Sequence, residues 1–387
     1  MSDIYKSYGV SSGKEEVHAA IKVMKPTSRS GAFCQAVAMG DDYHIIHADG
    51  AGTKAILAYL AYKENGDARV FEDIAVDSIV MNTDDMLCTG ITTDFLVSNT
   101  IGRNAQRIPQ EVLSAIMRGY QQFADNMADF GINIQLCGGE TADIGDLVST
   151  IVVDSTAFAK IPQKNFIDAS TLRPQKEVVI VGLASFGQSS YEQKTISGIG
   201  SNGFTVARHE TLCKDYAHRF PETFSSTLNI EQVYNGKYHL FDQVNGQQTV
   251  AELLLSPCRT YLPIMKTVYQ ELGSHILSVI HNTGGGLTKS INFGQNIRYI
   301  KDNLFDLPFV FELIQSNQDI SFKELWSIFN CGQRLEIYCE ATYAQTIIDV
   351  AKHFNVAAQI IGRIEPSASS KNEVLIQYKG NEVLYAK

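Results

Sequence analysis

The chain has 387 residues and a formal net charge of −10 at pH 7, from 32 basic and 42 acidic side chains. At roughly 150 residues per domain, this length predicts two domains, and 44% hydrophobic with 19% charged residues is typical of a globular protein. The negative charge argues against nucleic acid or an anionic membrane as a partner, because both would repel the protein.

The cysteines and the N-terminal sequence indicate a cytoplasmic protein. Seven cysteines are scattered along the chain without a C-x-x-C pair, which fits reduced thiols better than a disulfide framework or a zinc site. The N-terminus lacks the basic and apolar regions of a secretory signal, and no apolar stretch is long enough to span a bilayer. We therefore expect a cytoplasmic chain without a membrane partner.

The first half of the chain alternates strand-like and helix-like segments. Apolar residues recur at helical spacing over 71–88, and the helix expected over 109–130 opens with a proline in its first turn. The expected strands are 43–48, 94–98, 132–136 and 147–159, and the expected helices are 53–62, 71–88 and 109–130.

A domain boundary is expected near residue 170, because a polar segment containing Pro174 precedes an apolar run there. The expected domains are 1–170 and 171–387. In the second we expect strands at 177–185 and 276–281, helices at 202–213, 257–272 and 285–293, and a β-α-β-like tail over 334–364. The polar stretches 186–201 and 214–247 are expected to be surface loops, either lids or partner surfaces. Both halves are α+β.

The first candidate site is the turn Asp49-Gly50-Ala51-Gly52-Thr53-Lys54, between an expected strand and an expected helix. Its glycines let backbone N–H groups approach an anion, and a helix N-terminus favours negative charge. Lys54 could neutralise a phosphate, and Asp49 could hold a divalent cation. A simple strand-to-helix turn with a capping Asp explains the turn equally well.

Two further features bring carboxylates into the acidic first half. Asp84 and Asp85 interrupt an otherwise apolar helix, where a buried carboxylate is costly unless it is paired or binds a metal. Glu140 follows a Gly-Gly corner at the end of an expected strand. Exposed acids would be the ordinary explanation of each feature alone. Hard oxygen ligands without a His or Cys cluster favour Mg²⁺ over zinc.

The second half offers weaker signals. His281 ends an expected strand before Thr283-Gly284-Gly285-Gly286, where consecutive glycines favour a close approach of backbone to ligand. A core histidine and an ordinary turn are the simpler explanations. The sequence Gly198-Ile199-Gly200-Ser201-Asn202-Gly203 matches G-x-G-x-x-G, but it does not follow its strand directly, so we reject a dinucleotide site.

Taken in order, these motifs resemble the aminoimidazole ribonucleotide synthetase (phosphoribosylformylglycinamidine cyclo-ligase) family. D-G-x-G-T-K, an acidic pair, G-G-E-T-A, S-N-G, T-G-G-G and F-N-C-G occur here in that order. The resemblance runs from Tyr5-Lys6-Ser7-Tyr8-Gly9-Val10 to Ile361-Gly362-Arg363-Ile364, nearly the whole chain. F-N-C-G together with H-x-T-G-G-G favours the cyclo-ligase branch of the superfamily.

The resemblance implies a homodimer of two-domain α/β chains. The N-terminal domains would form a β-barrel-like interface, and the C-terminal domain would be a sheet packed with helices. ATP and Mg²⁺ would bind between the domains, with Asp49, Asp85 and Glu140 facing the metal and Lys54 facing phosphate. The other implied ATP- or substrate-binding residues are Gly50, Gly52, Thr53, Arg103, Ser201, Asn202, Thr283, Gly284, Gly285, Gly286 and Asn330.

Some motifs depart from the family pattern and indicate a divergent subgroup. The family's G-G-F-G loop is here Gly31-Ala32-Phe33-Cys34, and Gly200 replaces the usual histidine before S-N-G. F-N-C-G continues with Gln333 and Arg334 instead of small apolar residues.

The expected activity is ATP-dependent ring closure of formylglycinamidine ribonucleotide to aminoimidazole ribonucleotide, with release of ADP and phosphate. Phosphoryl transfer depends mainly on positioning and charge stabilisation, for which Lys54 is a candidate. His281 is the candidate for proton transfer, since imidazole titrates near neutral pH. The alternatives are another ATP-dependent enzyme of the superfamily, such as a hydrogenase-maturation dehydratase or selenophosphate synthetase, and a non-catalytic nucleotide-binding homologue.

Overall fold

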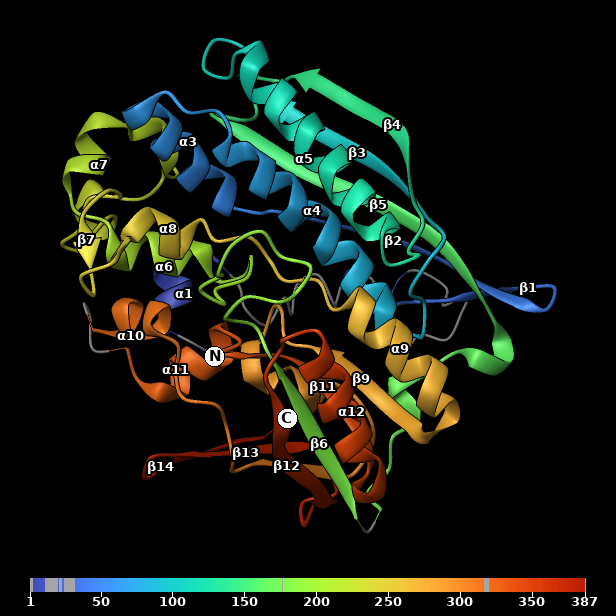
Figure 1. Ribbon diagram of the computed structural model, residues 1–387. Coiled ribbons are helices and arrows are strands. Elements are labelled where there is room, and N and C mark those ends of the chain that lie inside the picture. Colours follow the sequence, from blue (N-terminus) through green and yellow to red (C-terminus); the bar gives the residue numbers. More distant parts are fainter. Residues whose placement is uncertain are drawn as a thin grey trace.

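The computed structural model describes residues 3–10, 20, 23, 32–175, 177–316 and 320–386. Two large sheets, which share no strand, organise this part of the chain (Figure 1). The boundary predicted near residue 170 falls between the last strand of the first sheet and the first strand of the second. Among the described residues no helix is both long and apolar enough to cross a membrane.

The first sheet has five strands in the order β1-β2-β5-β3-β4, and only the β3–β4 pair is parallel. Its strands are β1 Val37–Met39, β2 Asp42–Gly50, β3 Phe95–Arg103, β4 Ile134–Asp143 and β5 Ile151–Pro162. Each predicted strand of the first half is present. The helix between β3 and β4 makes this parallel pairing possible, because parallel strands need a crossover.

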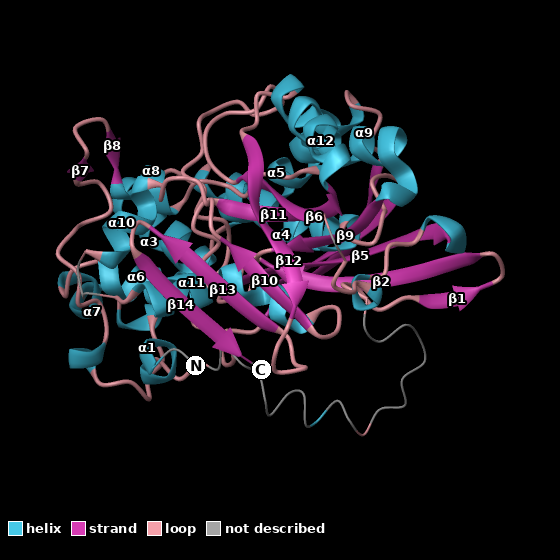
Figure 2. Ribbon diagram, turned by 90° about the horizontal axis from the view of Figure 1, so that it is seen from below, coloured by secondary structure: helices cyan, strands magenta, loops and turns pink. Residues whose placement is uncertain are grey.

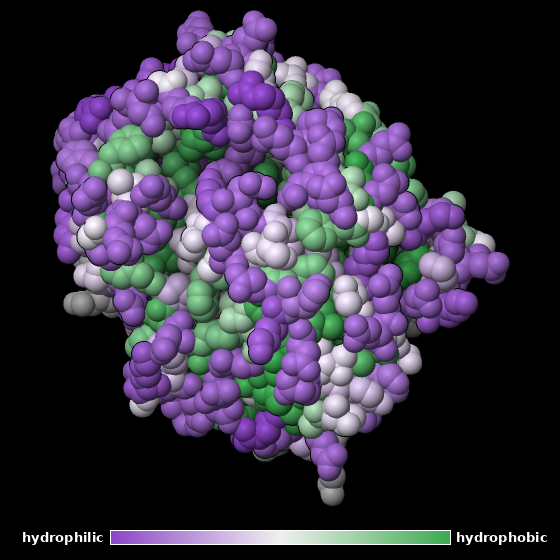
Figure 3. Space-filling model, in the orientation of Figure 1, coloured by the Kyte–Doolittle hydropathy of each residue, from purple (hydrophilic) through white to green (hydrophobic). Residues whose placement is uncertain are grey.

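Helices cover one face of the first sheet (Figure 1). They are α3 Lys54–Asn65, α4 Val70–Leu87 and α5 Gln110–Ala128. The buried residues of α5 recur every three or four positions, so one stripe packs on α4 and the opposite stripe faces water. Hydrophilic side chains accordingly cover most of the molecular face shown in Figure 3.

The other face of the first sheet carries exposed apolar side chains. Ile46 of β2 is directly opposite Phe158 of β5, which is opposite Leu96 of β3, so the three form a row across the sheet. Ile46 is 71% exposed and Leu96 41%, and Val152 of β5 is 38% exposed on the same face. This set, Ile46, Leu96, Val152 and Phe158, is called the open face below.

The second sheet has seven strands in the order β14-β13-β10-β12-β6-β11-β9. Figure 2 shows several of them side by side, seen from below. The strands are β6 Val178–Ala184, β9 Ile276–His281, β10 Ile297–Lys301, β11 Gln333–Glu340, β12 Ala358–Pro366, β13 Glu373–Tyr378 and β14 Asn381–Ala386. The β-α-β tail is present as β11, α12 and β12, with α12 spanning Ala341–His353.

Short elements fill the rest of the described chain. The helices are α1 Asp3–Ser7, α6 Phe204–Thr211, α7 Asp215–Arg219, α8 Val250–Leu254, α9 Leu262–Leu272, α10 Phe309–Gln315 and α11 Phe322–Ile328, and β7 Gln243–Val244 pairs with β8 Gln248–Thr249. The stretch 214–247, expected to be a loop, therefore includes α7 and β7, whose short lengths left no clear periodic pattern in the sequence.

Two expected helices differ from what their sequences predict. Helix α9 begins at Leu262 instead of 257, because the backbone N–H groups of Cys258 and Tyr261 are held by carboxylates of α4. The segment expected as a helix over 285–293 is the 3₁₀ helix η6 Gly286–Asn292. It starts after Gly285, whose φ of 94° lies in the left-handed region.

Candidate functional site

The two sheets meet at a pair of carboxylates. Asp49 lies near the end of β2 and Asp85 near the end of α4, where its side chain is almost fully buried. Burial and the nearby charge of Asp85 raise the pKa of Asp49. Burial also tends to raise the pKa of Asp85, but Lys289, His281 and His47 outweigh it and lower that pKa to about 2. Asp85 is therefore firmly ionised, and its charge, together with burial, disfavours the ionised form of Asp49.

His281 approaches Asp85 from the second sheet. Its Nδ1 is 2.7 Å from Asp85 Oδ1, and Arg334 Nε donates to its Nε2 at 2.7 Å. The ring is fully buried, and burial together with the Arg334 charge lowers its pKa to about 4. His281 is thus neutral at pH 7, with its proton on Nδ1 facing the carboxylate.

A second histidine, His47 of the first sheet, also faces Asp85. His47 Nδ1 is 3.1 Å from Asn82 Oδ1, and its Nε2 is 3.5 Å from Asp85 Oδ2. The Asn82 amide also donates to the backbone oxygen of Asp49 at 3.0 Å. The His47 side chain is 21% exposed, so solvent reaches this imidazole and not that of His281.

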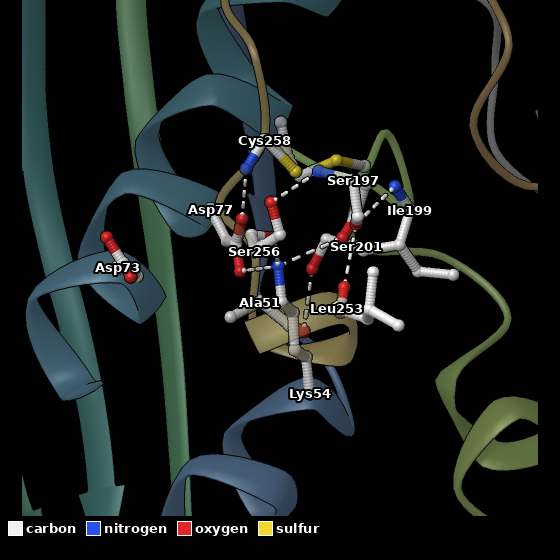
Figure 4. A network of polar contacts seen from close by, with 12 residues as sticks. Ala51, Lys54, Asp73, Asp77, Ser197, Ile199, Ser201, Leu253, Ser256 and Cys258 are labelled. Atoms are coloured by element: carbon white, nitrogen blue, oxygen red, sulfur yellow. Dashed lines mark hydrogen bonds and ion pairs between the residues drawn. The ribbon is translucent and has the colours of Figure 1, made fainter. Parts of the chain in front are cut away.

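Lys54 lies in a buried network instead of an open anion site (Figure 4). Its Nζ is 2.7 Å from Asp77 Oδ2, and it donates to the backbone oxygens of Gly200 at 3.0 Å and Ser256 at 2.5 Å. The side chains of Lys54 and Asp77 have no exposed surface. Two backbone acceptors and one carboxylate thus engage the ammonium, and Lys54 ties α3 and α4 to two loops of the second half.

Glu140 does not lie with Asp49 and Asp85. It is exposed on β4 opposite Thr100 of β3, and Thr100 is opposite Asp154 of β5, a row on the open-face side of the sheet. Asp49 is opposite the buried Ser155, on the side covered by helices. Within the described ranges, no three His, Cys, Asp or Glu side chains come close enough to share a metal ion.

Arg103, at the end of β3, is also engaged elsewhere. Its Nε is 2.7 Å from Asp143 Oδ1, and a terminal nitrogen donates to the backbone oxygen of Ile108 at 2.8 Å. These contacts hold the end of β3 to β4 and to the start of α5. The structure therefore places Arg103 in a local support role at this sheet edge.

The Asp49–Lys54 turn is shaped by its neighbours. A Cβ atom at Gly50 would stand 1.7 Å from Asp154 Oδ1, and Gly52 has a φ of 56°, so both glycines are needed by the backbone. The N–H of Gly50 donates to Asp49 Oδ1 at 2.7 Å, and Thr53 Oγ1 is 3.3 Å from Thr205 Oγ1.

The segment 198–201 is held by Asn330 of the F-N-C-G motif and by the Asp49–Lys54 turn. Asn330 donates to the backbone oxygens of Gly198 and Ile199, and Ser201 Oγ donates to the backbone oxygen of Ala51 at 2.9 Å. Both residues are buried and their polar groups are engaged. Asn202 is half-buried, and its side chain has no hydrogen-bond partner within the part of the chain that the structure describes.

The glycine loop beyond His281 divides into an open and a packed part. Gly284 is exposed, and a Cβ atom there would meet nothing within 4 Å. A Cβ atom at Gly286 would stand 2.4 Å from the backbone oxygen of Phe329. Gly284 therefore borders open space, while Gly286 is required for packing on α11.

Gly200 and Arg334, two departures from the family pattern, pack against each other. Arg334 donates to Cys258 Sγ at 2.9 Å and to Met81 Sδ at 3.2 Å, and a Cβ atom at Gly200 would stand 2.5 Å from one of its terminal nitrogens. The missing side chain at position 200 thus leaves room for the guanidinium of Arg334. Gly31, in the third departing motif, lies outside the described residues.

Sequence reasoning missed His47, Asp77, Arg334 and Lys289. A signal existed for His47, which precedes Asp49 by two residues and therefore shares its face of β2. No sequence signal marks Asp77, because its partner Lys54 is on another helix. Arg334 was noted only as a departure from the family pattern.

The chain is similar in sequence to known proteins. Residues 32–161 match the family model described as AIR synthase related protein, N-terminal domain. Phosphoribosylformylglycinamidine cyclo-ligase of Methanococcus maripaludis strain C7 is 27% identical over 98% of this chain and 99% of its own. The enzyme of the same name from Methanocaldococcus jannaschii is 26% identical over 93% of this chain and 87% of its own.

Solved structures share the fold at low identity. T. maritima PurL complexed with FGAR has a TM-score of 0.58 at 13% identity, and this chain spans about half (52%) of that chain's length while aligning over 99% of its own. A chain of the HypE–HypF complex has a TM-score of 0.54 at 12% identity, covering 96% of this chain and 99% of that one. Residues 32–161 thus resemble the N-terminal domain of AIR synthase related proteins, and nearly the whole chain is similar to enzymes named phosphoribosylformylglycinamidine cyclo-ligase.

Proposed function

We propose that the protein catalyses the ATP-dependent cyclisation of formylglycinamidine ribonucleotide to aminoimidazole ribonucleotide in purine biosynthesis. The observation that carries the proposal is the Asp49–Asp85 carboxylate pair where the two sheets meet, in a chain similar over its whole length to enzymes of that name. The T. maritima PurL structures of the same fold include complexes with FGAR and with ATP.

The carboxylate pair fits Mg²⁺. Mg²⁺ is usually held by one or two carboxylates together with substrate phosphates and water. Asp49 and Asp85 supply two hard oxygen donors, and burial and the Asp85 charge, which raise the pKa of Asp49, would favour a cation beside them. We assign Asp49 and Asp85 to hold the ion, which would neutralise the triphosphate. Glu140, on the opposite side of the sheet, is outside this pair.

The chemistry requires a better leaving group at the formyl carbon. Transfer of the γ-phosphoryl group of ATP to the formyl oxygen gives an iminophosphate and ADP. An internal nitrogen then attacks the same carbon, the C–O bond breaks, and the oxygen leaves with phosphate. Catalysis of such transfer depends on alignment and charge compensation, which a fixed carboxylate pair between two sheets can provide.

The contacts of His281 and Lys54 favour roles that differ from those implied by the resemblance. His281 has both nitrogens occupied, so we propose that it orients Asp85. Lys54 is ion-paired with Asp77 and donates to two backbone oxygens, so we propose that it fixes the turn that carries Asp49. His47 is the partly exposed imidazole beside Asp85, and it becomes the candidate for proton transfer.

We also propose a cytoplasmic homodimer. The open face exposes apolar side chains on a sheet whose other face is covered by helices, as a surface buried between two copies would. All seven cysteines are free, which suits a reducing compartment.

The test is an assay of aminoimidazole ribonucleotide and ADP with formylglycinamidine ribonucleotide, ATP and Mg²⁺. Wild-type protein is expected to form both products in equal amounts, and Asp85→Asn to lose roughly 100-fold or more of kcat, the scale for removing a key electrostatic group. Asp349→Asn, an exposed acid on α12, is the matched control and should keep full activity. ADP without the imidazole product would instead favour another enzyme of the superfamily.

A further inference from the structure

One lysine reaches the carboxylate pair from the second half of the chain. Lys289 lies in η6, directly after the Thr283–Gly286 loop, and its Nζ donates to Thr283 Oγ1. The ammonium also stands over the ring of Phe33, 4.6 Å from the centroid. That ring is stacked on Phe293 at 5.2 Å, so the lysine is held from two sides.

The charge of Lys289 acts on the site without being neutralised there. It lowers the pKa of both Asp49 and Asp85 and opposes protonation of His281. Within the described ranges, however, no carboxylate lies within the 4.0 Å of an ion pair with Lys289. The side chain is half-buried, so part of it remains exposed.

The other positive groups near the site are already engaged. Lys54 is buried against Asp77, and Arg334 is buried among His281, Cys258 and Met81. A polyanionic ligand brought to two carboxylates needs a cation from the protein as well as from bound metal. Of Lys54, Arg334 and Lys289, only Lys289 is partly exposed and without an ion-pair partner among the described residues.

We propose that Lys289 binds a phosphate group of the ligand, the role that the family resemblance gave to Lys54. The proposal rests on the proposed function for its ligands, and the phosphate belongs either to ATP or to the ribonucleotide substrate. Thr283 and Phe33 hold the ammonium in place. It lies near enough to Asp49 and Asp85 for its charge to act on both carboxylates.

The experiment measures two dissociation constants by isothermal titration calorimetry, for Mg·ATP and for formylglycinamidine ribonucleotide alone. Variants are Lys289→Met, Lys289→Arg and the control Lys352→Met, an exposed lysine at the end of α12. Loss of a charge-assisted contact is expected to weaken binding of one ligand roughly tenfold to hundredfold in Lys289→Met. Lys289→Arg should stay within a few-fold of wild type, and Lys352→Met should match it.

The ligand that weakens identifies the source of the phosphate. Binding of both ligands within twofold of wild type in Lys289→Met would overturn the proposal, as would an equal loss in Lys289→Arg, because the charge would then be irrelevant. This outcome is separate from that of the cyclisation assay. Weaker Mg·ATP binding in Lys289→Met supports the lysine's role even if no imidazole product forms, and product formation with unchanged binding supports the function while rejecting the lysine's role.

Discussion

The buried ion pair of Lys54 and Asp77 is the residue-scale feature with the largest expected effect on stability. Removing one partner of a buried pair leaves an uncompensated charge, which typically costs 3–5 kcal/mol. We expect Lys54→Met to lose about that much free energy of unfolding in urea titrations. Lys63→Met, an exposed lysine on the same helix, should change it by about 0.5 kcal/mol or less.

The double variant Lys54→Met/Asp77→Leu separates the charge from the packing. If the cost comes from the stranded carboxylate, the double variant should be more stable than Lys54→Met alone. A Lys54→Met protein as stable as wild type, with normal nucleotide binding, would contradict the network in Figure 4.

Acid sensitivity should come partly from His209, outside the site. The ring is buried in α6, with Arg208 at 3.1 Å and the backbone N–H of Tyr234 at 3.2 Å, and both neighbours are donors. Burial, followed by the charges of Arg208 and Lys214, lowers its pKa to about 2. Stability from the neutral ring is complete above the unfolded pKa near 6.5 and falls as the pH drops toward 2.

The variant His209→Gln should flatten this pH dependence. Wild type should lose up to about 1.4 kcal/mol per pH unit below pH 6.5 through this residue, measured by denaturant unfolding at several pH values. The control His218→Gln changes an exposed histidine on α7 and should keep the wild-type slope. An unchanged slope in His209→Gln would show that the ring is not buried as a neutral group.

At the residue scale, the sequence pointed to residues that lie together in the structure, but not to all of their contact partners. Asp49, Asp85 and His281 come together as expected, because each stands at the end of an element next to the junction of the two sheets. The burial of Lys54 depends on Asp77 and Ser256, which no spacing connects to it. The separation of Glu140 follows from strand register, which depends on the pairing of β3 with β4.

At the element scale, the glycine loop before η6 allows a matched test. Gly286 has a φ of 52°, and a Cβ atom there would stand 2.4 Å from the backbone oxygen of Phe329, whereas Gly284 has open space. We expect Gly286→Ala to cost on the order of 2 kcal/mol, because both the backbone and α11 must shift. Gly284→Ala should melt within about 2 °C of wild type.

Thermal unfolding of the two variants checks this difference. Equal melting temperatures for Gly284→Ala and Gly286→Ala would contradict the packing of the loop on α11. We expect Gly286→Ala to weaken nucleotide and substrate binding as well as stability, since the loop also positions Thr283 and Lys289.

Elements with strong periodicity were predictable and those set by distant contacts were not. The apolar spacing of α4 and α5 identified both helices to within a few residues. The start of α9 was misplaced, because Asp77 and Asp84 of α4 capture the backbone N–H groups of the preceding segment. Strands β10, β13 and β14 were not predicted separately, since their short runs resemble ordinary loop and core segments.

At the scale of the whole molecule, the open face should hold two chains together. Ile46 is 71% exposed in one chain, so Ile46→Glu costs that chain little stability but places charge in an apolar interface. Sedimentation should show a wild-type dimer and an Ile46→Glu monomer. Leu384→Glu, a 50% exposed position on β14 of the other sheet, should remain dimeric.

A monomeric wild type would contradict the dimer proposal, and so would a dimeric Ile46→Glu protein. The two-sheet α/β class was predictable because its elements alternate along each half of the chain. The interface was expected only from the family resemblance, because one chain's sequence does not state what covers an exposed face.

The fate of the formyl oxygen is the most direct test of the proposed cyclisation. Formylglycinamidine ribonucleotide labelled with ¹⁸O at the formyl group is converted with ATP and Mg²⁺, and the phosphate and nucleotide products are analysed by mass spectrometry. Transfer of the phosphoryl group to the formyl oxygen predicts one ¹⁸O in each phosphate released, with equal amounts of ADP and aminoimidazole ribonucleotide. Release of unlabelled phosphate, or ADP formed without the imidazole, would contradict cyclisation through a phosphorylated formyl oxygen.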